Sequence, residues 1–249
     1  MKVLLITAAG LSGRFSQSVG YPCLKCIYSQ EGIQQSLLYQ MIHQDGEFDY
    51  YVVVGGFLFE ELKAAAEEIS RKLKKKLILV KNDHYEDYGS GYSLYLGLSQ
   101  IRNLDFDQLV FAEGDLYVDR QSFQKLYDCP GNVITCSQEA ILASKAVAFY
   151  FDQHRRIHYI YDTEHQILEV KEPFMGIFNS GQIWKFADRL RVRQAMDKIS
   201  EKAWQGTNLV FIQEYFGGLE KDQYEMITFR KWINCNTLSD YKSIKEGGE

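Results

Sequence analysis

The segment Ala8-Ala9-Gly10-Leu11-Ser12-Gly13-Arg14 has the composition of a phosphate-binding turn, and it directly follows an apolar run at residues 3–7. A glycine-rich turn at the end of a strand lets backbone N–H groups approach phosphate oxygens, and an arginine adds a charged fork. The segment is neither a GxGxxG dinucleotide fingerprint nor a Walker A loop. It predicts a phosphate site, and a tight turn carrying a surface arginine is the alternative.

A lysine follows this turn in Tyr21-Pro22-Cys23-Leu24-Lys25-Cys26. Lys25 is suited to balancing triphosphate charge. The two cysteines form a CxxC, but the sequence has no second CxxC to complete a structural zinc site. Residues 24–28 are predicted to be extended, whereas a redox CxxC usually opens a helix. Lys25 is therefore the functional candidate of this segment.

An acidic residue ends a hydrophobic run in Phe111-Ala112-Glu113-Gly114-Asp115-Leu116. Open α/β sheets bind ligands at the carboxyl ends of their strands. A carboxylate there can hold Mg²⁺ against nucleotide phosphates, because that ion prefers oxygen ligands. Asp115 is the predicted metal ligand, and a turn aspartate that caps the next helix is the alternative.

Hydroxyl and small residues precede a predicted helix in the segment 82–94, where Ser90 and Ser93 are the candidates. A helix N-terminus can receive a base, a ribose or a phosphate. The alternative is a long loop that ends in serine caps.

Strand and helix patterns alternate in the first half of the chain. Buried strands are predicted at residues 3–7, 50–54, 77–80 and 108–111, and helices at 34–43, 59–75 and 92–101. Strands separated by helices of this length pair in parallel through right-handed crossovers.

The second half has shorter patterns. Strands are predicted at residues 133–136, 146–151, 157–161, 167–170, 226–228 and 232–233, most of them antiparallel, and helices at 181–190, 192–204 and 208–216. A last helix begins near residue 237, with Asn236 or Thr237 as its cap. These elements predict an α/β fold with a mixed central sheet flanked by helices, in one domain of residues 1–249. Residues 1–120 would be the nucleotide-binding half and residues 121–249 the acceptor-binding half.

Composition excludes several classes of protein. The 249 residues carry a net charge of −5, which argues against nucleic acid as the main partner. No apolar run reaches the length of a membrane span. Five scattered cysteines are typical of reduced thiols, so we expect a cytoplasmic protein without membrane insertion.

These segments, in this order, resemble the GT-A-type nucleotidyltransferases, with CTP:phosphocholine cytidylyltransferases of bacterial surface-polymer synthesis and sugar-1-phosphate nucleotidyltransferases as the most similar members. The usual opening of that superfamily is a strand, then Ala-Ala-Gly-x-Gly-x-Arg, then Pro-Lys. Residues 178–181 (Phe-Asn-Ser-Gly) resemble its later glycine turn, and residues 232–241 its closing segment. The resemblance covers almost the whole chain and implies a Rossmann-like GT-A fold.

The resemblance also implies a reaction. An acceptor phosphate or phosphonate oxygen attacks the α-phosphorus of a nucleoside triphosphate, CTP for the most similar members, and pyrophosphate leaves. The roles it implies are as follows: Arg14 and Lys25 for catalysis; Ala8, Ala9, Gly10, Ser12, Gly13, Arg14, Ser90 and Ser93 for the nucleotide; Asp115 and Asn236 for Mg²⁺; and Tyr85, Ser180 and Gly181 for an acceptor such as phosphocholine or a sugar phosphate.

Three residues depart from the superfamily pattern. Ser12 replaces a loop glycine, Cys23 occupies the usual lysine position, and Asn236 stands where a second metal aspartate is expected. Two alternatives therefore stay open: a degenerate, non-catalytic nucleotide-binding relative, and a GT-A glycosyltransferase that uses a nucleotide-sugar. The second would favour a DxD pair, whereas this chain has Glu113-Gly114-Asp115.

Overall fold

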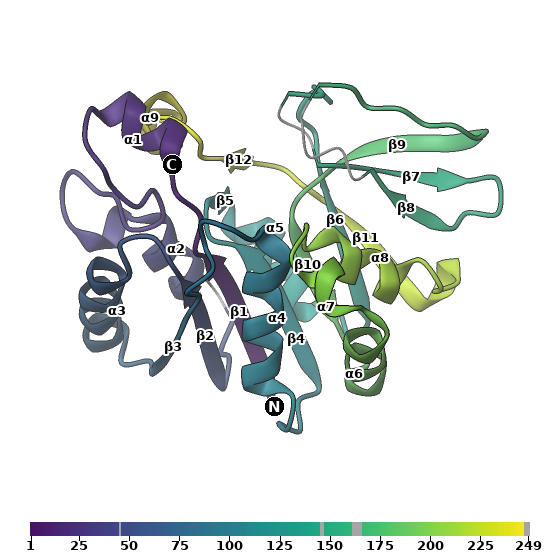
Figure 1. Ribbon diagram of the computed structural model, residues 1–249, viewed down its shortest axis with the longest axis horizontal. Helices are drawn as coiled ribbons and strands as arrows, with labels where there is room; N and C mark the ends of the chain where they lie inside the picture. Colours follow the sequence, from purple (N-terminus) through teal and green to yellow (C-terminus); the bar gives the residue numbers. More distant parts are fainter. Residues whose placement is uncertain (45, 145–146, 161–165, 247–249) are drawn as a thin grey trace.

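A computed structural model describes residues 1–44, 46–144, 147–160 and 166–246. Its main feature is a ten-stranded sheet with the strand order β3-β2-β1-β4-β10-β6-β9-β7-β8, and β11 also pairs with β6 (Figure 1). The strands are β1 (Lys2–Ala8), β2 (Tyr50–Gly55), β3 (Leu77–Lys81), β4 (Gln108–Glu113), β6 (Asn132–Ser137), β7 (Ala148–Asp152), β8 (Ile157–Tyr159), β9 (Phe174–Ser180), β10 (Ile183–Phe186) and β11 (Tyr224–Phe229).

The first four strands are parallel, as the alternating pattern predicts. Alternate residues of β1 face opposite sides of the sheet. Val3 and Leu5 pack with helix α4 (Ser90–Ile101), while Leu4 and Ile6 pack with α2 (Leu37–His43) and α3 (Phe59–Leu73). Helices cover both faces, which explains why these strands are almost continuously apolar. The predicted α/β class, with a mixed central sheet that is mostly parallel in the N-terminal half, is therefore confirmed.

Strand β10 corrects the prediction of a helix at residues 181–190. It runs antiparallel between β4 and β6 and is buried along its whole length. A short apolar run that is buried on both faces has no period-two pattern, so periodicity cannot distinguish it from a buried helix. Lys185 lies within the run, and its ammonium donates to the backbone carbonyls of Leu126, Tyr127 and Cys129 at the end of α5 (Arg120–Asp128).

Two further predictions in the second half were wrong in whole or in part, and one strand was missed. Residues 167–170 form no strand, whereas β9 was not predicted as one. The helix predicted at 192–204 is two helices, α6 (Arg189–Lys198) and α7 (Glu201–Trp204), and the Ser200 side chain caps the second of them. Residues 146 and 161, which the predicted strands include, lie outside the described residues.

The end of the chain returns to its beginning. Strand β12 (Trp232–Asn234) pairs with β5 (Leu116–Val118), and α9 (Leu238–Glu246) lies beside α1 (Gly13–Val19) (Figure 1). Thr237 caps α9 as predicted, in a reciprocal exchange with Asp240: the Thr237 N–H donates to the Asp240 carboxylate, and the Asp240 N–H donates to the Thr237 hydroxyl. This return brings Asn236 beside the first strands of the sheet.

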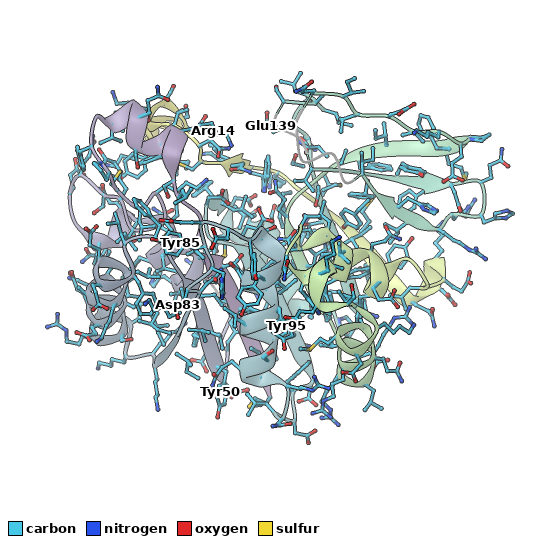
Figure 2. The ribbon with its side chains drawn as sticks, in the orientation of Figure 1. Arg14, Tyr50, Asp83, Tyr85, Tyr95 and Glu139 are labelled. Carbon is cyan, nitrogen blue, oxygen red and sulfur yellow. The ribbon has the colours of Figure 1, made fainter. Side chains whose placement is uncertain are left out.

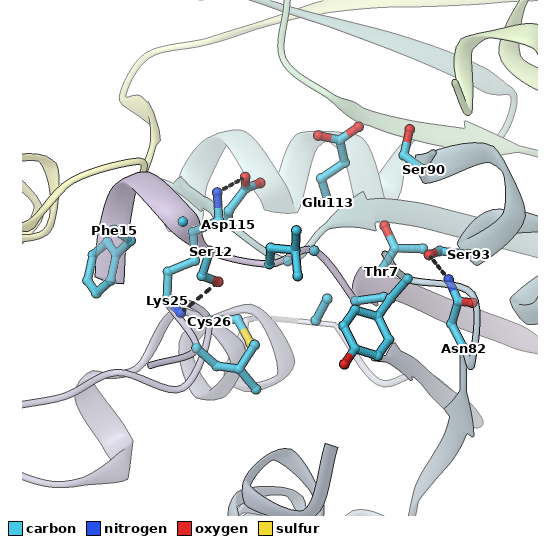
Figure 3. Close-up of a pocket in the computed structure, with 18 of the residues that line it drawn as sticks. Thr7, Ser12, Phe15, Lys25, Cys26, Asn82, Ser90, Ser93, Glu113 and Asp115 are labelled. Carbon is cyan, nitrogen blue, oxygen red and sulfur yellow. Dashed lines mark hydrogen bonds and ion pairs between the residues drawn. The ribbon is translucent and has the colours of Figure 1, made fainter. Parts of the chain in front are cut away.

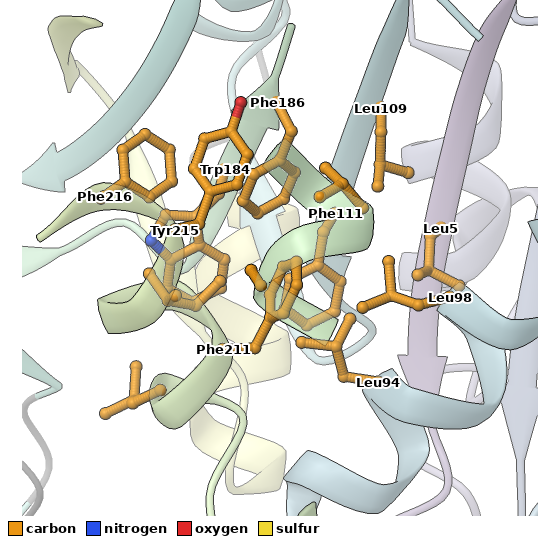
Figure 4. Close-up of a cluster of buried hydrophobic side chains, with 14 of the residues drawn as sticks. Leu5, Leu94, Leu98, Leu109, Phe111, Trp184, Phe186, Phe211, Tyr215 and Phe216 are labelled. Carbon is orange, nitrogen blue, oxygen red and sulfur yellow. The ribbon is translucent and has the colours of Figure 1, made fainter. Parts of the chain in front are cut away.

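Aromatic rings join the two halves of the sheet in one core. Trp184 of β10 stacks on Phe111 of β4 at 5.3 Å between ring centroids, and its indole N–H donates to the hydroxyl of Tyr159 on β8 (Figure 4). Tyr215 and Phe216 of α8 (Leu209–Phe216) pack against Phe186. In the part of the chain that the structure describes, every helix is too short or too polar to cross a bilayer.

Candidate active site

A pocket of about 370 Å³ opens over the carboxyl ends of β1 and β4 (Figure 3). Its lining comes from five separate parts of the chain. It consists of Thr7, Ala8, Ala9, Gly10, Leu11, Ser12, Gly13, Arg14, Phe15, Leu24, Lys25, Cys26, Asn82, Tyr85, Tyr88, Gly89, Ser90, Ser93, Glu113, Gly114, Asp115 and Asn236. All of the predicted nucleotide, catalytic and metal residues are therefore brought together around one opening.

Lys25 reaches this pocket because the segment around it turns. The N–H groups of Ile27 and Tyr28 both donate to the carbonyl of Leu24, so the predicted extended conformation of residues 24–28 is wrong. Cys23 packs instead among Phe15, Cys235 and other buried side chains. The turn thus directs the lysine into the pocket and the cysteine into the core. Cys23 and Cys26 are free thiols.

Lys25 joins two side chains that come from distant parts of the sequence. Its Nζ lies 2.6 Å from Oδ2 of Asp115 and 3.1 Å from Oδ1 of Asn236. Arg14 also donates to Oδ1 of Asn236, at 3.0 Å. Two cations therefore share one amide oxygen, and one of them is paired with the carboxylate at the end of β4.

Contacts on three sides fix the orientation of Asn236. Its side-chain Nδ2 donates to Oδ1 of Asn234 at 2.8 Å, so Oδ1 is the atom directed at the cations. Its backbone N–H donates to the carboxylate of Asp240. The adjacent Cys235 N–H donates to the carbonyl of Asp115 at 2.8 Å, which holds the two metal candidates side by side.

The oxygens of Asp115 and Asn236 fit a divalent cation. Oδ1 of Asp115 is buried and has no hydrogen-bond partner, so it is available as a ligand. A carboxylate and an amide carbonyl are hard oxygen donors of the type that Mg²⁺ takes, and this ion keeps several waters or substrate oxygens in addition. Over the described ranges, no three His, Cys, Asp or Glu side chains gather as a metal-binding group.

The glycine-rich turn has the backbone geometry that its sequence suggests. Ser12 adopts a left-handed conformation with φ of 52°, at the position where the superfamily pattern has glycine. The Ser12 hydroxyl accepts from the Lys25 N–H at 3.3 Å and so links this turn to the lysine segment. Arg14 then lies on α1, and Tyr85 lies in the loop before α4 (Figure 2).

The N-terminus of α4 is less open than the sequence suggests. The N–H groups of Gly89 and Gly91 donate to the carbonyls of Gln205 and Gly206. Ser90 Oγ accepts from the Asn208 N–H, and Ser93 Oγ accepts from Nδ2 of Asn82. Ser90 and Ser93 line the pocket, but the first backbone donors of the helix are already used within the protein.

Glu113 is a pocket residue that the site prediction did not include. Its Oε1 accepts from Nδ2 of Asn208 at 2.7 Å, and it stands between Asp115 and Ser90 (Figure 3). Burial, and then the negative charge of Asp115, raise the pKa of Glu113 to about 7. Its position at the carboxyl end of β4, two residues before Asp115, could have identified Glu113 as a site residue from the sequence.

The predicted acceptor residues fall in different places. Tyr85 lines the pocket. Ser180 and Gly181 do not, because both are buried: their N–H groups donate to the carbonyls of Val147 and Thr135. A Cβ on Gly181 would lie 2.6 Å from the Thr135 hydroxyl, so close packing explains this glycine. Ser180 and Gly181 therefore lie outside the lining of this pocket, and their acceptor role stays a prediction.

Solved structures similar to this chain include two that are described as transferases that use CTP. The inositol-1-phosphate CTP transferase from T. maritima superposes with a TM-score of 0.68 at 17% identity, covering 99% of this chain and 97% of the other. The CTP:phosphocholine cytidylyltransferase LicC from Streptococcus pneumoniae gives 0.66 at 16%, covering 100% and 99%. HddC from Yersinia pseudotuberculosis, complexed with GMP-PN, gives 0.63 at 14%, covering all of both chains.

These likenesses confirm the predicted resemblance at the level of the fold. No curated protein sequence matches the chain. A protein-family model does match it, over residues 21–247, which include Lys25, Asp115 and Asn236. The chain therefore belongs to the family described as a domain of unknown function, DUF6564.

Proposed function

We propose that this protein is a Mg²⁺-dependent nucleotidyltransferase. It would transfer a nucleoside monophosphate, CMP from CTP in the first instance, to a small phosphorylated or phosphonate acceptor such as phosphocholine or a sugar phosphate. The observation that carries the proposal is the convergence of Arg14, Lys25, Asp115 and Asn236 around one pocket at the carboxyl ends of β1 and β4. The likeness in fold to nucleotidyltransferases supports the same class. The pathway of such an enzyme would be the synthesis of cell-surface polysaccharides, in the cytoplasm.

The reaction that this site would perform is an in-line displacement. An acceptor phosphate oxygen attacks the α-phosphorus, the bond to the bridging oxygen breaks, and pyrophosphate leaves with the bonding electrons. No general base is needed, because the acceptor is already an anion. Most of the catalysis in such transfers comes from positioning and from neutralising charge.

The residues of the chain would divide these tasks between them. Arg14 and Lys25 would balance the negative charge of the triphosphate, and the glycine-rich turn would approach its oxygens. Asp115 and Asn236 would hold Mg²⁺, which when bound adds positive charge on the phosphate oxygens. Ser90, Ser93 and Tyr85 would line the nucleoside and acceptor regions.

The test is a pyrophosphate-release assay with each of the four nucleoside triphosphates, Mg²⁺ and a panel of acceptors that includes phosphocholine and sugar 1-phosphates. We expect turnover that depends on both substrates and on Mg²⁺. Lys25→Ala and Asp115→Asn should each lower kcat by about 10²-fold or more. Nucleotide binding without pyrophosphate release on any acceptor would instead identify a non-catalytic relative.

A further inference from the structure

The ammonium of Lys25 lies between Asp115 and Asn236, the two predicted metal ligands. It lies 2.6 Å from a carboxylate oxygen of the first and 3.1 Å from the amide oxygen of the second. A Mg²⁺ ion binds such oxygens at about 2.0–2.1 Å. An ion that contacts Oδ2 of Asp115 and Oδ1 of Asn236 would therefore lie close to the present position of the ammonium.

The charges around Asp115 and Asn236 disfavour binding of a divalent ion while the Lys25 ammonium is in contact with them. The side chains of Lys25 and Asp115 are 19% and 20% exposed, so water screens their interaction only in part. Arg14 adds a second positive charge on the same amide oxygen. A divalent ion entering beside two intact cationic side chains would meet strong repulsion, and Lys25 already holds Oδ2 of Asp115 and Oδ1 of Asn236, so that Oδ1 of Asp115 is the predicted ligand atom without a partner.

We propose that Lys25 guards the metal site: in the nucleotide-free protein it takes the place of the divalent ion, and the triphosphate draws it away. The incoming phosphates offer the ammonium new anionic partners, which frees the oxygens of Asp115 and Asn236 for the metal. Metal and nucleotide then bind together, and the empty protein does not hold the metal firmly. This inference rests on the metal site of the proposed function and adds the order in which that site fills.

The position of the lysine in the sequence supports this role. Lys25 lies two residues beyond the usual lysine position, which Cys23 occupies, and the turn at residues 24–28 directs it at Asp115. The Ser12 hydroxyl holds the backbone N–H of Lys25. The side chain can therefore exchange partners while its backbone stays in place.

The test is titration of the full chain with Mn²⁺ alone, followed by calorimetry and by the electron paramagnetic resonance signal of free Mn²⁺. Three forms are compared: the wild type, Lys25→Met, which removes the charge and keeps the chain length, and Lys25→Gln, which keeps a hydrogen-bond donor. We expect both variants to bind Mn²⁺ at least tenfold more tightly than the wild type. Adding Asp115→Asn to either variant should abolish that gain.

Lys81→Met is the matched control, because Lys81 forms an exposed ion pair with Asp83 at the same distance of 2.6 Å. It should leave Mn²⁺ affinity unchanged. Saturating Mn²⁺ should also raise the melting temperature of Lys25→Met by several degrees more than that of the wild type, since an ion that binds only the folded state stabilises it.

Equal Mn²⁺ affinity in the wild type and in both Lys25 variants would overturn the proposal, whatever the catalytic result. Turnover by the wild type without that gain would leave the proposed function standing and remove the guarding role. A gain in Mn²⁺ affinity without nucleotide turnover would support the guarding role and remove the proposed reaction.

Discussion

Asn236 is the single residue whose chemistry differs most from the expected pattern. Its amide oxygen faces Arg14 and Lys25, and its amide nitrogen is held by Asn234. An aspartate at this position would keep the oxygen and would place a second oxygen against Oδ1 of Asn234. The side-chain amide of Asn234 can turn over to donate instead, so the exchange is sterically possible.

Asn236→Asp should tighten Mg²⁺ binding by about tenfold, which corresponds to about 1.4 kcal/mol, because the ligand gains a negative charge. The measurement is the Mg²⁺ dependence of nucleotide binding, made with nucleotide present. Asn234→Asp serves as the control, since it adds the same charge beside the site without changing a predicted ligand. Equal Mg²⁺ dependence in the wild type and in Asn236→Asp would count against Asn236 as a ligand.

Buried thiols give the protein a predictable dependence on pH. Burial raises the pKa of Cys26 and of Cys235 to about 12. A thiol whose pKa is raised on folding contributes stability that is complete below its unfolded value, near 9, and is lost as the pH rises from there towards 12. The free energy of unfolding should therefore fall by about 1.4 kcal/mol per thiol per pH unit above pH 9.

Chemical denaturation at pH 8 and pH 10 checks this expectation. A variant that carries Cys26→Ala and Cys235→Ala should be less stable at pH 8 because of the cavities, yet should lose less stability between the two pH values. If the wild type and the variant lost equal stability between pH 8 and pH 10, groups other than these two thiols would cause the loss of stability at alkaline pH.

At the scale of the element, close packing of the N-terminus of α4 against residues 204–207 positions Ser90 and Ser93. Gly89 and Gly91 donate to the carbonyls of Gln205 and Gly206, and a Cβ on Gly91 would lie 2.7 Å from the carbonyl oxygen of Trp204. Only a residue without a side chain fits there, so these glycines serve packing rather than phosphate binding.

Gly91→Ala should lower the free energy of unfolding by about 1–3 kcal/mol through overpacking, and it should weaken nucleotide binding by moving α4. Denaturant titration and a nucleotide thermal shift measure the two effects. Gly131→Ala is the control, since no atom lies within 4 Å of a Cβ at that position. Similar stability of the two variants would show that Gly91 is packed less closely against residues 204–207 than the contacts indicate.

At the scale of the whole molecule, β10 connects the parallel half of the sheet to the antiparallel half. Trp184 contacts Phe111 on one side and bonds to Tyr159 on the other, so its ring belongs to both halves. A shared core of this kind makes separate unfolding of the halves unfavourable.

Trp184→Ala should cost about 3–5 kcal/mol of stability, because it leaves a large cavity and removes the hydrogen bond to the Tyr159 hydroxyl. We expect one transition in the wild type, with tyrosine fluorescence and far-ultraviolet circular dichroism coinciding. Leu190→Ala is the control, as that side chain is 60% exposed. Two separate transitions in the wild type would show that the halves are independent.

Local patterns in the sequence were sufficient to predict many of the helices and strands of this fold. The parallel strands and helices of the first half have long periodic or apolar patterns, and the glycine turn and Asp115 directly follow strands. The patterns failed at β10, where burial on both faces removes the periodic signal, and at β9, whose residues do not alternate between buried and exposed. The break between α6 and α7 depends on a single serine cap, which is a weak local signal.

The sequence by itself identified the candidate residues for the proposed chemistry: a glycine turn with Arg14, a lysine close behind it, and an acid at a strand end. Only the tertiary structure decided how they combine. Lys25 meets Asp115 across 90 positions and Asn236 across 211, while Ser180 is buried elsewhere. The physical reason is that a side chain's direction depends on the turn that carries it and on the elements packed around it, and those contacts are made by residues far apart in the chain.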